Sequence, residues 1–320
     1  MGTSDGEGKV AAAVDLGSTS VHLLVARIVD HRVEALIDES VFLGLGEAVE
    51  ERGVLGSEGR ESLVDALAHY AWTCRQAAAV SITFVGTEPL RRLADAARIV
   101  DEVQEATGVP LHVLSHEEEA YLTLVGVMEG RPVDREVLVV DIGGGSSEFV
   151  SIGPDRRAEA AGVRVGATLL TGQLVAGDPP TAAELEALRR AARQAVAGAP
   201  DAHPAEVVLV GGTASNLLKV VPGGPVSRRL GPSDLDAAFR IVAGDVADAI
   251  AAAHGVKPGR ARILGAGAAI VGAILERYGT EEVRVSESGI REGAVLAVSH
   301  AGAGWRDRLE NLAHGWVGPD

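Results

Sequence analysis

A short aliphatic segment that ends in an aspartate and a glycine-containing turn occurs twice in this chain. The first copy is Val14–Ser18 (Val-Asp-Leu-Gly-Ser) and the second is Val140–Gly144 (Val-Asp-Ile-Gly-Gly). Each copy follows a run of aliphatic residues and precedes another apolar run, which is typical of two β-strands joined by a tight turn. Such a motif, repeated far apart in one chain, indicates a duplicated domain. The sequence therefore predicts two domains of similar architecture.

Short apolar strands alternate with helical stretches around the two copies, and this alternation predicts an α/β fold. In the first half the expected strands are Val10–Val29 (broken at Gly17-Ser18), Val33–Leu43, Ser81–Val85 and Leu111–Leu114, and the expected helices are Glu58–Ala79 and Pro89–Thr107. In the second half, Val207–Val210 leads through a Gly-Gly-Thr turn into a helix.

The polar segment Glu129–Glu136 contains Gly130 and Pro132 and is the expected boundary and hinge. We expect an N-terminal domain over residues 1–129, a C-terminal domain over residues 130–300, and a separate C-terminal helix over residues 301–320. Apolar residues recur in that last stretch at helical spacing and predict an amphipathic helix, docked on its own protein or at a dimer interface; they are Trp305, Leu309, Leu312 and Trp316.

Composition fits a cytoplasmic protein with two domains. The length of 320 residues is more than one ordinary core needs. Cys74 is the single cysteine, so no intramolecular disulfide can form, and a reducing compartment is expected. The residues from Met1 to Lys9 lack the apolar core of a signal peptide, and no apolar run is long enough to cross a membrane.

The formal net charge of −16 argues against broad nucleic-acid binding. A polyanionic substrate would need a local positive pocket or a metal ion. Arginine outnumbers lysine among the cations, and its planar fork suits phosphate, although codon usage also explains that bias.

The two aspartate–glycine turns have one chemical logic. Glycine permits a tight turn in which successive N–H groups converge on a phosphate oxygen. Asp15 and Asp141 end their strands at the same place, where a carboxylate can hold Mg²⁺ or its water shell. A glycine-rich turn is often only a turn, but two copies that each carry an aspartate favour phosphate binding.

Two glutamates are candidates for catalysis. Glu148 follows the second turn and can point back at a bound phosphate, with an exposed strand position as the alternative. Ser115 and Glu118 form a capping box at the start of a helix. Glu119 shares a face with Leu122 and is expected to point inward, where its carboxylate can activate a water.

Taken in order, these motifs resemble the exopolyphosphatase/guanosine pentaphosphate phosphatase (Ppx/GppA) family of the actin-like ATPase superfamily. The resemblance spans roughly residues 10–300. It rests on Asp15–Ser20 with His22-Leu23, Thr87–Arg91, Glu118–Ala120 followed by Gly126-Val127, Val140–Glu148, the segment around Gly166, Val210–Ser215, and Ser288–Ala294.

The resemblance implies two ribonuclease-H-like (actin-like) α/β domains with an interdomain cleft as active site, and Mg²⁺-dependent hydrolysis of terminal phosphate from inorganic polyphosphate or guanosine pentaphosphate. It implies that Glu119 is the general base, that Glu148 assists the base or the metal, and that Arg91 neutralises phosphoryl charge. The remaining implied roles are Mg²⁺ binding by Asp15, Asp141 and Glu148, and phosphate binding by Gly17, Ser18, Gly143, Gly144, Gly145 and Ser146.

The chain also departs from the family pattern. Thr19 and Asp95 stand where asparagine is frequent, and His116 stands where glycine is usual. Asp95 adds negative charge that could weaken substrate binding. The resemblance at this length implies the short two-domain form of the family, for which processive digestion of a long polymer is less expected.

Two other functions remain open at this point. One is a small-molecule kinase of the same superfold, and the other is a nucleotide or polyphosphate sensor with little turnover. The resemblance also implies a homodimer, whereas no nucleic-acid or membrane partner is expected.

Overall fold

The computed structural model describes residues 8–131, 133–155 and 157–314, which form two units. One unit combines Met1–Pro132 with Ser288–Asp320, and the other is Val133–Glu287. The sequence had placed the end of the second domain at residue 300. The second unit instead ends before α14 (Ile290–Ala301), and the chain then returns to the first unit. The reason is packing, because α14 lies against α5 (His116–Met128) and β1 (Lys9–Leu16) of the first unit.

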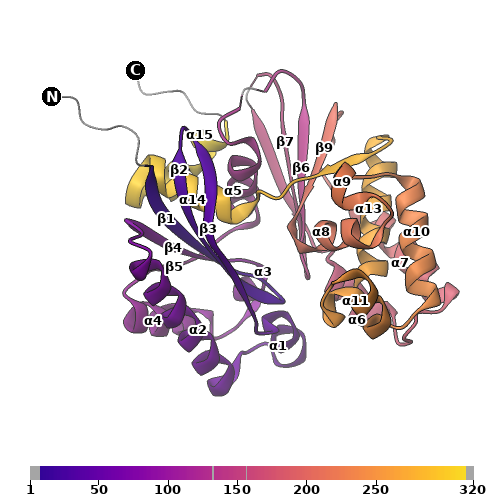
Figure 1. The fold of residues 1–320 in the computed structure, drawn as a ribbon, viewed down its shortest axis with the longest axis horizontal. Helices are drawn as coiled ribbons and strands as arrows, with labels where there is room; N and C mark the ends of the chain where they lie inside the picture. The colour runs from indigo at the N-terminus through magenta and orange to yellow at the C-terminus, as the bar shows by residue number, and fades with distance from the viewer. Residues whose placement is uncertain (1–7, 132, 156, 315–320) are drawn as a thin grey trace. The chain divides into compact units, whose positions relative to one another are not determined.

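The first unit is a five-stranded sheet with helices on both faces (Figure 1). Its strand order is β3-β2-β1-β4-β5, in which β1, β2 and β3 are antiparallel and β1, β4 and β5 are parallel. The strands beside β1 are β2 (Ser20–Val29), β3 (Arg32–Phe42), β4 (Ser81–Gly86) and β5 (Leu111–Val113). The helices besides α5 and α14 are α1 (Leu45–Arg52), α2 (Gly56–Gln76), α3 (Glu88–Arg92), α4 (Ala96–Thr107) and α15 (Leu309–Ala313).

Successive side chains of β1 point to opposite faces of the sheet, and both faces are buried. Ala12, Val14 and Leu16 join the core formed with α2 and α4. Ala11 and Ala13 are equally buried but point to the opposite face, where α14 packs on the strand. Asp15 has the parity of Ala13, so the sequence places its carboxylate on the α14 face.

The helices α5 and α14 approach each other with backbone in contact. A Cβ on Gly293 would lie 1.7 Å from the Leu122 carbonyl oxygen, and one on Gly126 would lie 2.0 Å from the Gly289 carbonyl oxygen. Only glycine fits at either crossing position. This contact explains why a glycine is needed in the Ser288–Ala294 motif.

The second unit contains a six-stranded sheet of order β10-β11-β9-β6-β7-β8. Its strands are β6 (Val137–Ile142), β7 (Ser147–Ile152), β8 (Ala158–Val163), β9 (Glu206–Val210), β10 (Arg229–Leu230) and β11 (Val283–Val285). Its helices are α6 (Ala167–Leu174), α7 (Ala182–Val196), α8 (Gly211–Val220), α9 (Gly224–Ser227), α10 (Pro232–Gly244), α11 (Ala247–His254), α12 (Pro258–Arg262) and α13 (Leu264–Tyr278). The main core joins one face of β6 and β9 to α7, α8 and α13.

The two sheets have the same connectivity. Read from β8, the second sheet runs β8-β7-β6-β9-β11, and the first runs β3-β2-β1-β4-β5. In each, three antiparallel strands are followed by two strands that run parallel to the third. The α/β class and the duplication predicted from the repeated motif are therefore confirmed.

Two predicted helices differ from the structure. The stretch expected as one helix from Pro89 to Thr107 is divided into α3 and α4, because Leu93 adopts an extended conformation. The C-terminal stretch is not one continuous helix either. After α14, Gly302 has a positive φ, and two short 3-10 turns, η1 (Gly302–Gly304) and η2 (Arg306–Arg308), precede α15. Trp316 lies outside the described residues.

Candidate functional site

The repeated motif forms the same hairpin in both units. The Gly17 amide donates to the Ser20 carbonyl at 3.2 Å, and the Gly143 amide donates to the Ser146 carbonyl at 3.0 Å. The aspartates sit at equivalent positions, one residue before the last residue of β1 and of β6. Sequence and structure therefore agree on two matching loops, the first loop at residues 17–20 and the second loop at residues 143–146.

Each aspartate faces a different residue across its hairpin. Asp15 pairs with His22 in the register of β1 and β2, and Asp141 pairs with Glu148 in that of β6 and β7. Glu148 thus occupies the position in the second unit that His22 occupies in the first. Glu148 follows Asp141 by the same number of residues as His22 follows Asp15, and this equal spacing could have revealed the equivalence in the sequence.

Glu148 is buried, with 2% of its surface exposed, so the alternative of an exposed strand residue was wrong. Its Oε1 accepts a hydrogen bond of 2.7 Å from the Ser146 hydroxyl. Because directly opposed residues of an antiparallel pair share a face, Asp141 and Glu148 place two carboxylates side by side. Two hard oxygen donors of like charge suit a divalent cation such as Mg²⁺.

The carbonyls of the second loop are engaged by α6. The amide of Ala167 donates to the Gly143 carbonyl at 3.1 Å, and that of Leu169 donates to the Gly144 carbonyl at 2.9 Å. Gly166 permits this approach, because a Cβ there would lie 2.2 Å from the Gly144 oxygen. Within the described part of the chain, the amides of Gly144 and Gly145 have no hydrogen-bond acceptor.

The first loop is arranged in the same way by α1 and the residues before it. The Ser18 carbonyl accepts from the Gly46 amide at 2.7 Å, and the Thr19 carbonyl accepts from the amides of Leu43 and Gly44. The amides of Ser18 and Thr19 have no acceptor among the described residues. Each loop therefore bonds two of its carbonyls to the protein and leaves two amides available for an anion.

Glu119 lies in the first turns of α5, and the structure places Arg91 beside it. Glu119 is buried, with 6% exposed, whereas Glu117 is exposed, as the helical spacing predicted. Arg91 Nη1 donates to Glu119 Oε2 at 2.7 Å and to the Leu114 carbonyl at 2.9 Å. Arg91 Nη2 lies 3.0 Å from Nδ1 of His116, which takes the place of the usual glycine.

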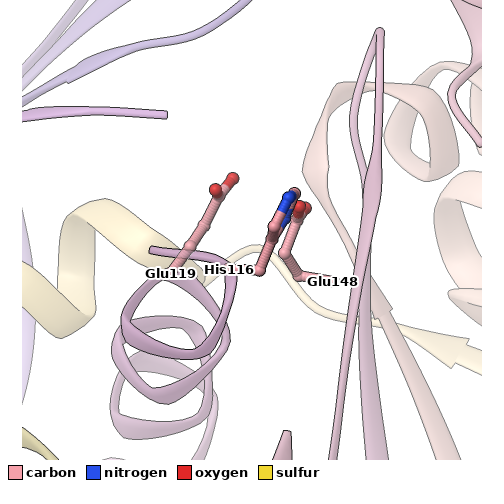
Figure 2. Close-up of side chains that lie close together, drawn as sticks. All are labelled: His116, Glu119 and Glu148. Atoms are coloured by element: carbon pink, nitrogen blue, oxygen red, sulfur yellow. The ribbon is translucent and has the colours of Figure 1, made fainter. Parts of the chain in front are cut away.

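Figure 2 shows His116 and Glu119 projecting from the start of α5, and it also labels Glu148 on β7. The predicted capping box is confirmed, because Ser115 and Glu118 each bond to the other's backbone amide. A serine N-cap with three following glutamates fixes the helix start. That start places the Glu119 carboxylate within reach of Arg91.

Glu88 is a buried carboxylate that the sequence did not single out. It has 6% of its surface exposed. Its Oε2 accepts from the Ser18 hydroxyl at 3.2 Å, and its Oε1 accepts from Arg92 Nη1 at 2.8 Å. Glu88 therefore links α3 to the first loop. The Thr-Glu-Pro sequence after β4 was the available signal.

Arg260 on α12 is a second residue that sequence reasoning missed. Its guanidinium lies against Gly212, where a Cβ would be 3.3 Å from Nη1. Burial lowers the pKa of Arg260, and among the described residues no carboxylate pairs with it. A partly buried guanidinium beside the Gly211–Thr213 turn can receive an anion.

Asp95 does not stand free at the edge of the first unit. Its Oδ2 accepts from Arg60 Nη1 at 3.0 Å, and its Oδ1 accepts from the Leu55 amide at 3.2 Å. Both side chains of the ion pair are mostly buried. The negative charge that distinguishes this chain at position 95 is therefore already compensated.

Comparison with known proteins supports the fold described above. A crystal structure of an Aquifex aeolicus Ppx/GppA family member superposes with a TM-score of 0.79, at 24% identity over 92% of this chain and 99% of that chain. Exopolyphosphatase 1 of Mycobacterium bovis is 28% identical over 88% of this chain and 86% of the relative. A guanosine-5'-triphosphate,3'-diphosphate pyrophosphatase of Vibrio vulnificus is 33% identical over 48% of this chain but only 31% of its own length.

The two matching sheets and their paired loops define an α/β protein of the actin-like fold class. The Ppx/GppA phosphatase family model matches residues 24–301. The chain belongs to the Ppx/GppA phosphatase family. None of the helices in the described part of the chain has the length and apolar character that a membrane span requires.

Proposed function

We propose that this chain is an exopolyphosphatase that removes terminal phosphate from inorganic polyphosphate, with guanosine pentaphosphate as a second candidate substrate. The observation that carries the proposal is the pair of matching loops. In each, two successive carbonyls bond to the protein while two successive amides lack an acceptor among the described residues. Phosphoryl transfer requires mainly positioning and charge stabilisation, which such loops provide.

In this proposal the phosphate-binding residues are Gly17, Ser18, Gly143, Gly144, Gly145 and Ser146. Arg260 adds a guanidinium beside the Gly211–Thr213 turn. Glu88 orients the Ser18 hydroxyl. The local cations and amides offset the formal net charge of −16 that otherwise repels a polyanion.

Glu119 is the proposed general base that takes a proton from the attacking water. The Arg91 guanidinium at 2.7 Å stabilises negative charge on its carboxylate. Arg91 is also the proposed partner of the transferred phosphoryl group. A bidentate guanidinium can bond to a carboxylate and a phosphate oxygen at once.

Mg²⁺ is the proposed cofactor. Asp141 and Glu148 fit it, because they offer two oxygen donors on one face of the hairpin, and Asp15 is the proposed ligand of the first unit. Bound Mg²⁺ would neutralise phosphate charge. The test measures binding of Mn²⁺ in competition with Mg²⁺. Asp141→Asn should weaken metal binding, whereas Asp236→Asn, an exposed control on α10, should leave it unchanged.

The decisive experiment measures phosphate release from short polyphosphate, long polyphosphate, guanosine pentaphosphate and ATP, each with and without Mg²⁺. Metal-dependent release from polyphosphate supports the exopolyphosphatase. ADP formation that requires an added acceptor would indicate a kinase. Tight nucleotide binding without phosphate release would indicate a sensor.

A homodimer and a cytoplasmic location remain predictions. Trp305 and Leu309 are buried within their own unit, with 2% and 1% of their surfaces exposed, so they do not supply a dimer surface. Sedimentation at micromolar concentration tests the dimer, and a monomer throughout would refute it. Cell fractionation tests the location.

A further inference from the structure

The segment after α14 packs on the start of α5. Trp305 is buried and contacts the His112 ring edge-on, with ring centroids 5.4 Å apart. Leu309 is buried as well, and α15 packs along α5. The sequence marked this segment as amphipathic, and the proposed function gives it no role.

Arg306 joins this segment to the capping residue of α5. Its Nε and Nη2 donate to both carboxylate oxygens of Glu118, the second at 2.7 Å, and Nη2 also donates to the Val113 carbonyl at 2.8 Å. Glu118 in turn accepts from the Ser115 amide at 2.7 Å. Burial acts to raise the pKa of Glu118, but hydrogen bonds from Arg306 and Ser115 outweigh it, and the pKa falls below its ordinary value.

Arg91 makes the corresponding contacts one residue further along. Arg306 bonds to the carbonyl of Val113 and to Glu118, whereas Arg91 bonds to the carbonyl of Leu114 and to Glu119. The first turn of α5 is thus held by two guanidiniums from different elements. One comes from α3 and the other from the C-terminal segment.

We propose that Arg306 is a positioning residue, which fixes the start of α5 and thereby the orientation of the Glu119 carboxylate. An exposed ion pair alone contributes little stability. Here the guanidinium bonds in bidentate fashion to a capping carboxylate and also to a backbone carbonyl, so its loss loosens one helix start. Small displacements of a catalytic group lower the rate of the chemical step.

This inference rests on the proposed function for its catalytic part, and hydrogen exchange tests the structural part independently. In Arg306→Gln, the amides of Glu118, Glu119 and Ala120 should exchange at least roughly tenfold faster than in the wild type. Arg308→Gln is the matched control, because Arg308 is exposed and has no ion pair among the described residues. Unchanged exchange in Arg306→Gln would overturn the proposal.

The proposed effect on catalysis predicts that the substitution changes kcat but not KM. With polyphosphate, Arg306→Gln should lower kcat about tenfold and leave KM unchanged. Arg306→Lys, which keeps the charge but not the fork, should recover part of kcat, and it replaces the glutamine variant if that variant does not fold. Equal loss in kcat and in folded fraction would reduce Arg306 to a structural role. No turnover by the wild type would refute the proposed function, while hydrogen exchange still decides the positioning role.

Discussion

Arg91 donates from Nη1 to Oε2 of Glu119 at 2.7 Å, and both side chains are mostly buried. The two residues are far apart in the sequence and come from different helices, α3 and α5. Their contact places a guanidinium on the carboxylate that we propose as general base. It also makes the orientation of that carboxylate dependent on how both helices are packed.

Replacement of Glu119 by glutamine tests the base. Glu119→Gln keeps the size and one hydrogen-bond acceptor for Arg91 but cannot take a proton. We expect turnover to fall by about 10²-fold or more with substrate binding largely kept. Steady-state kinetics and binding measurements on polyphosphate check this. The control is Glu117→Gln on the exposed side of the same helix turn; unchanged turnover in Glu119→Gln would move the base elsewhere, with Glu148 the next candidate.

From the sequence, the negative charge of Asp95 could weaken substrate binding, but the structure pairs this residue with Arg60. We therefore expect Asp95→Asn to leave KM for polyphosphate unchanged, and to lower stability by about 1 kcal/mol through the weakened bond to Arg60. Kinetics and urea denaturation check the two effects. Asp65→Asn, at an exposed site on α2, is the control for a lost negative charge. A lower KM in Asp95→Asn alone would mean that this charge acts on the substrate.

Gly293→Ala tests the contact between α5 and α14. Because the added Cβ would lie 1.7 Å from the Leu122 carbonyl, the helices must separate, and we expect a loss of about 3 kcal/mol or more. Denaturation followed by tryptophan fluorescence reports on the first unit, which contains Trp72 and Trp305.

Gly172→Ala is the matched control for this substitution. Gly172 is also within a helix, but its added Cβ would meet nothing within 4 Å. That substitution should be neutral or stabilise the protein by up to about 1 kcal/mol. Equal effects of the two alanines would show that steric contact at Gly293 is not the cause.

The pair His31 and His300 predicts a pH dependence of stability. Nδ1 of His31 lies 3.1 Å from Nε2 of His300, and the rings stack. Burial, together with the charges of His31 and Lys9, lowers the pKa of His300 to about 4 from 6.5. The unfolded chain therefore binds a proton at higher pH than the folded chain, so this contribution is present above pH 6.5 and is lost as the pH falls toward 4.

Melting temperatures of the wild type and His300→Gln, measured from pH 7.5 to 5, check this prediction. The difference between the two proteins removes the effect of the carboxylates, which titrate in both. The melting temperature of the wild type should fall more steeply. Parallel curves would show that His300 does not titrate differently in the folded state.

The sequence by itself determined the local features of this protein. The repeated aliphatic–aspartate–glycine motif predicted two equivalent hairpins, because alternation and glycine turns act over a few residues. Helical spacing placed Glu119 on the buried face of α5, and Ser115 with Glu118 fixed the helix start, because capping is local as well. These features needed no knowledge of distant segments.

Only the tertiary structure decided which distant groups meet. Arg60 beside Asp95, Arg306 on Glu118, Glu88 at the Ser18 hydroxyl and Arg260 against Gly212 all join separate elements. The return of α14 to the first unit depends on two glycines that let helix backbones touch. Such contacts are set by packing between segments far apart in the chain, so periodicity along the sequence carries no information about them.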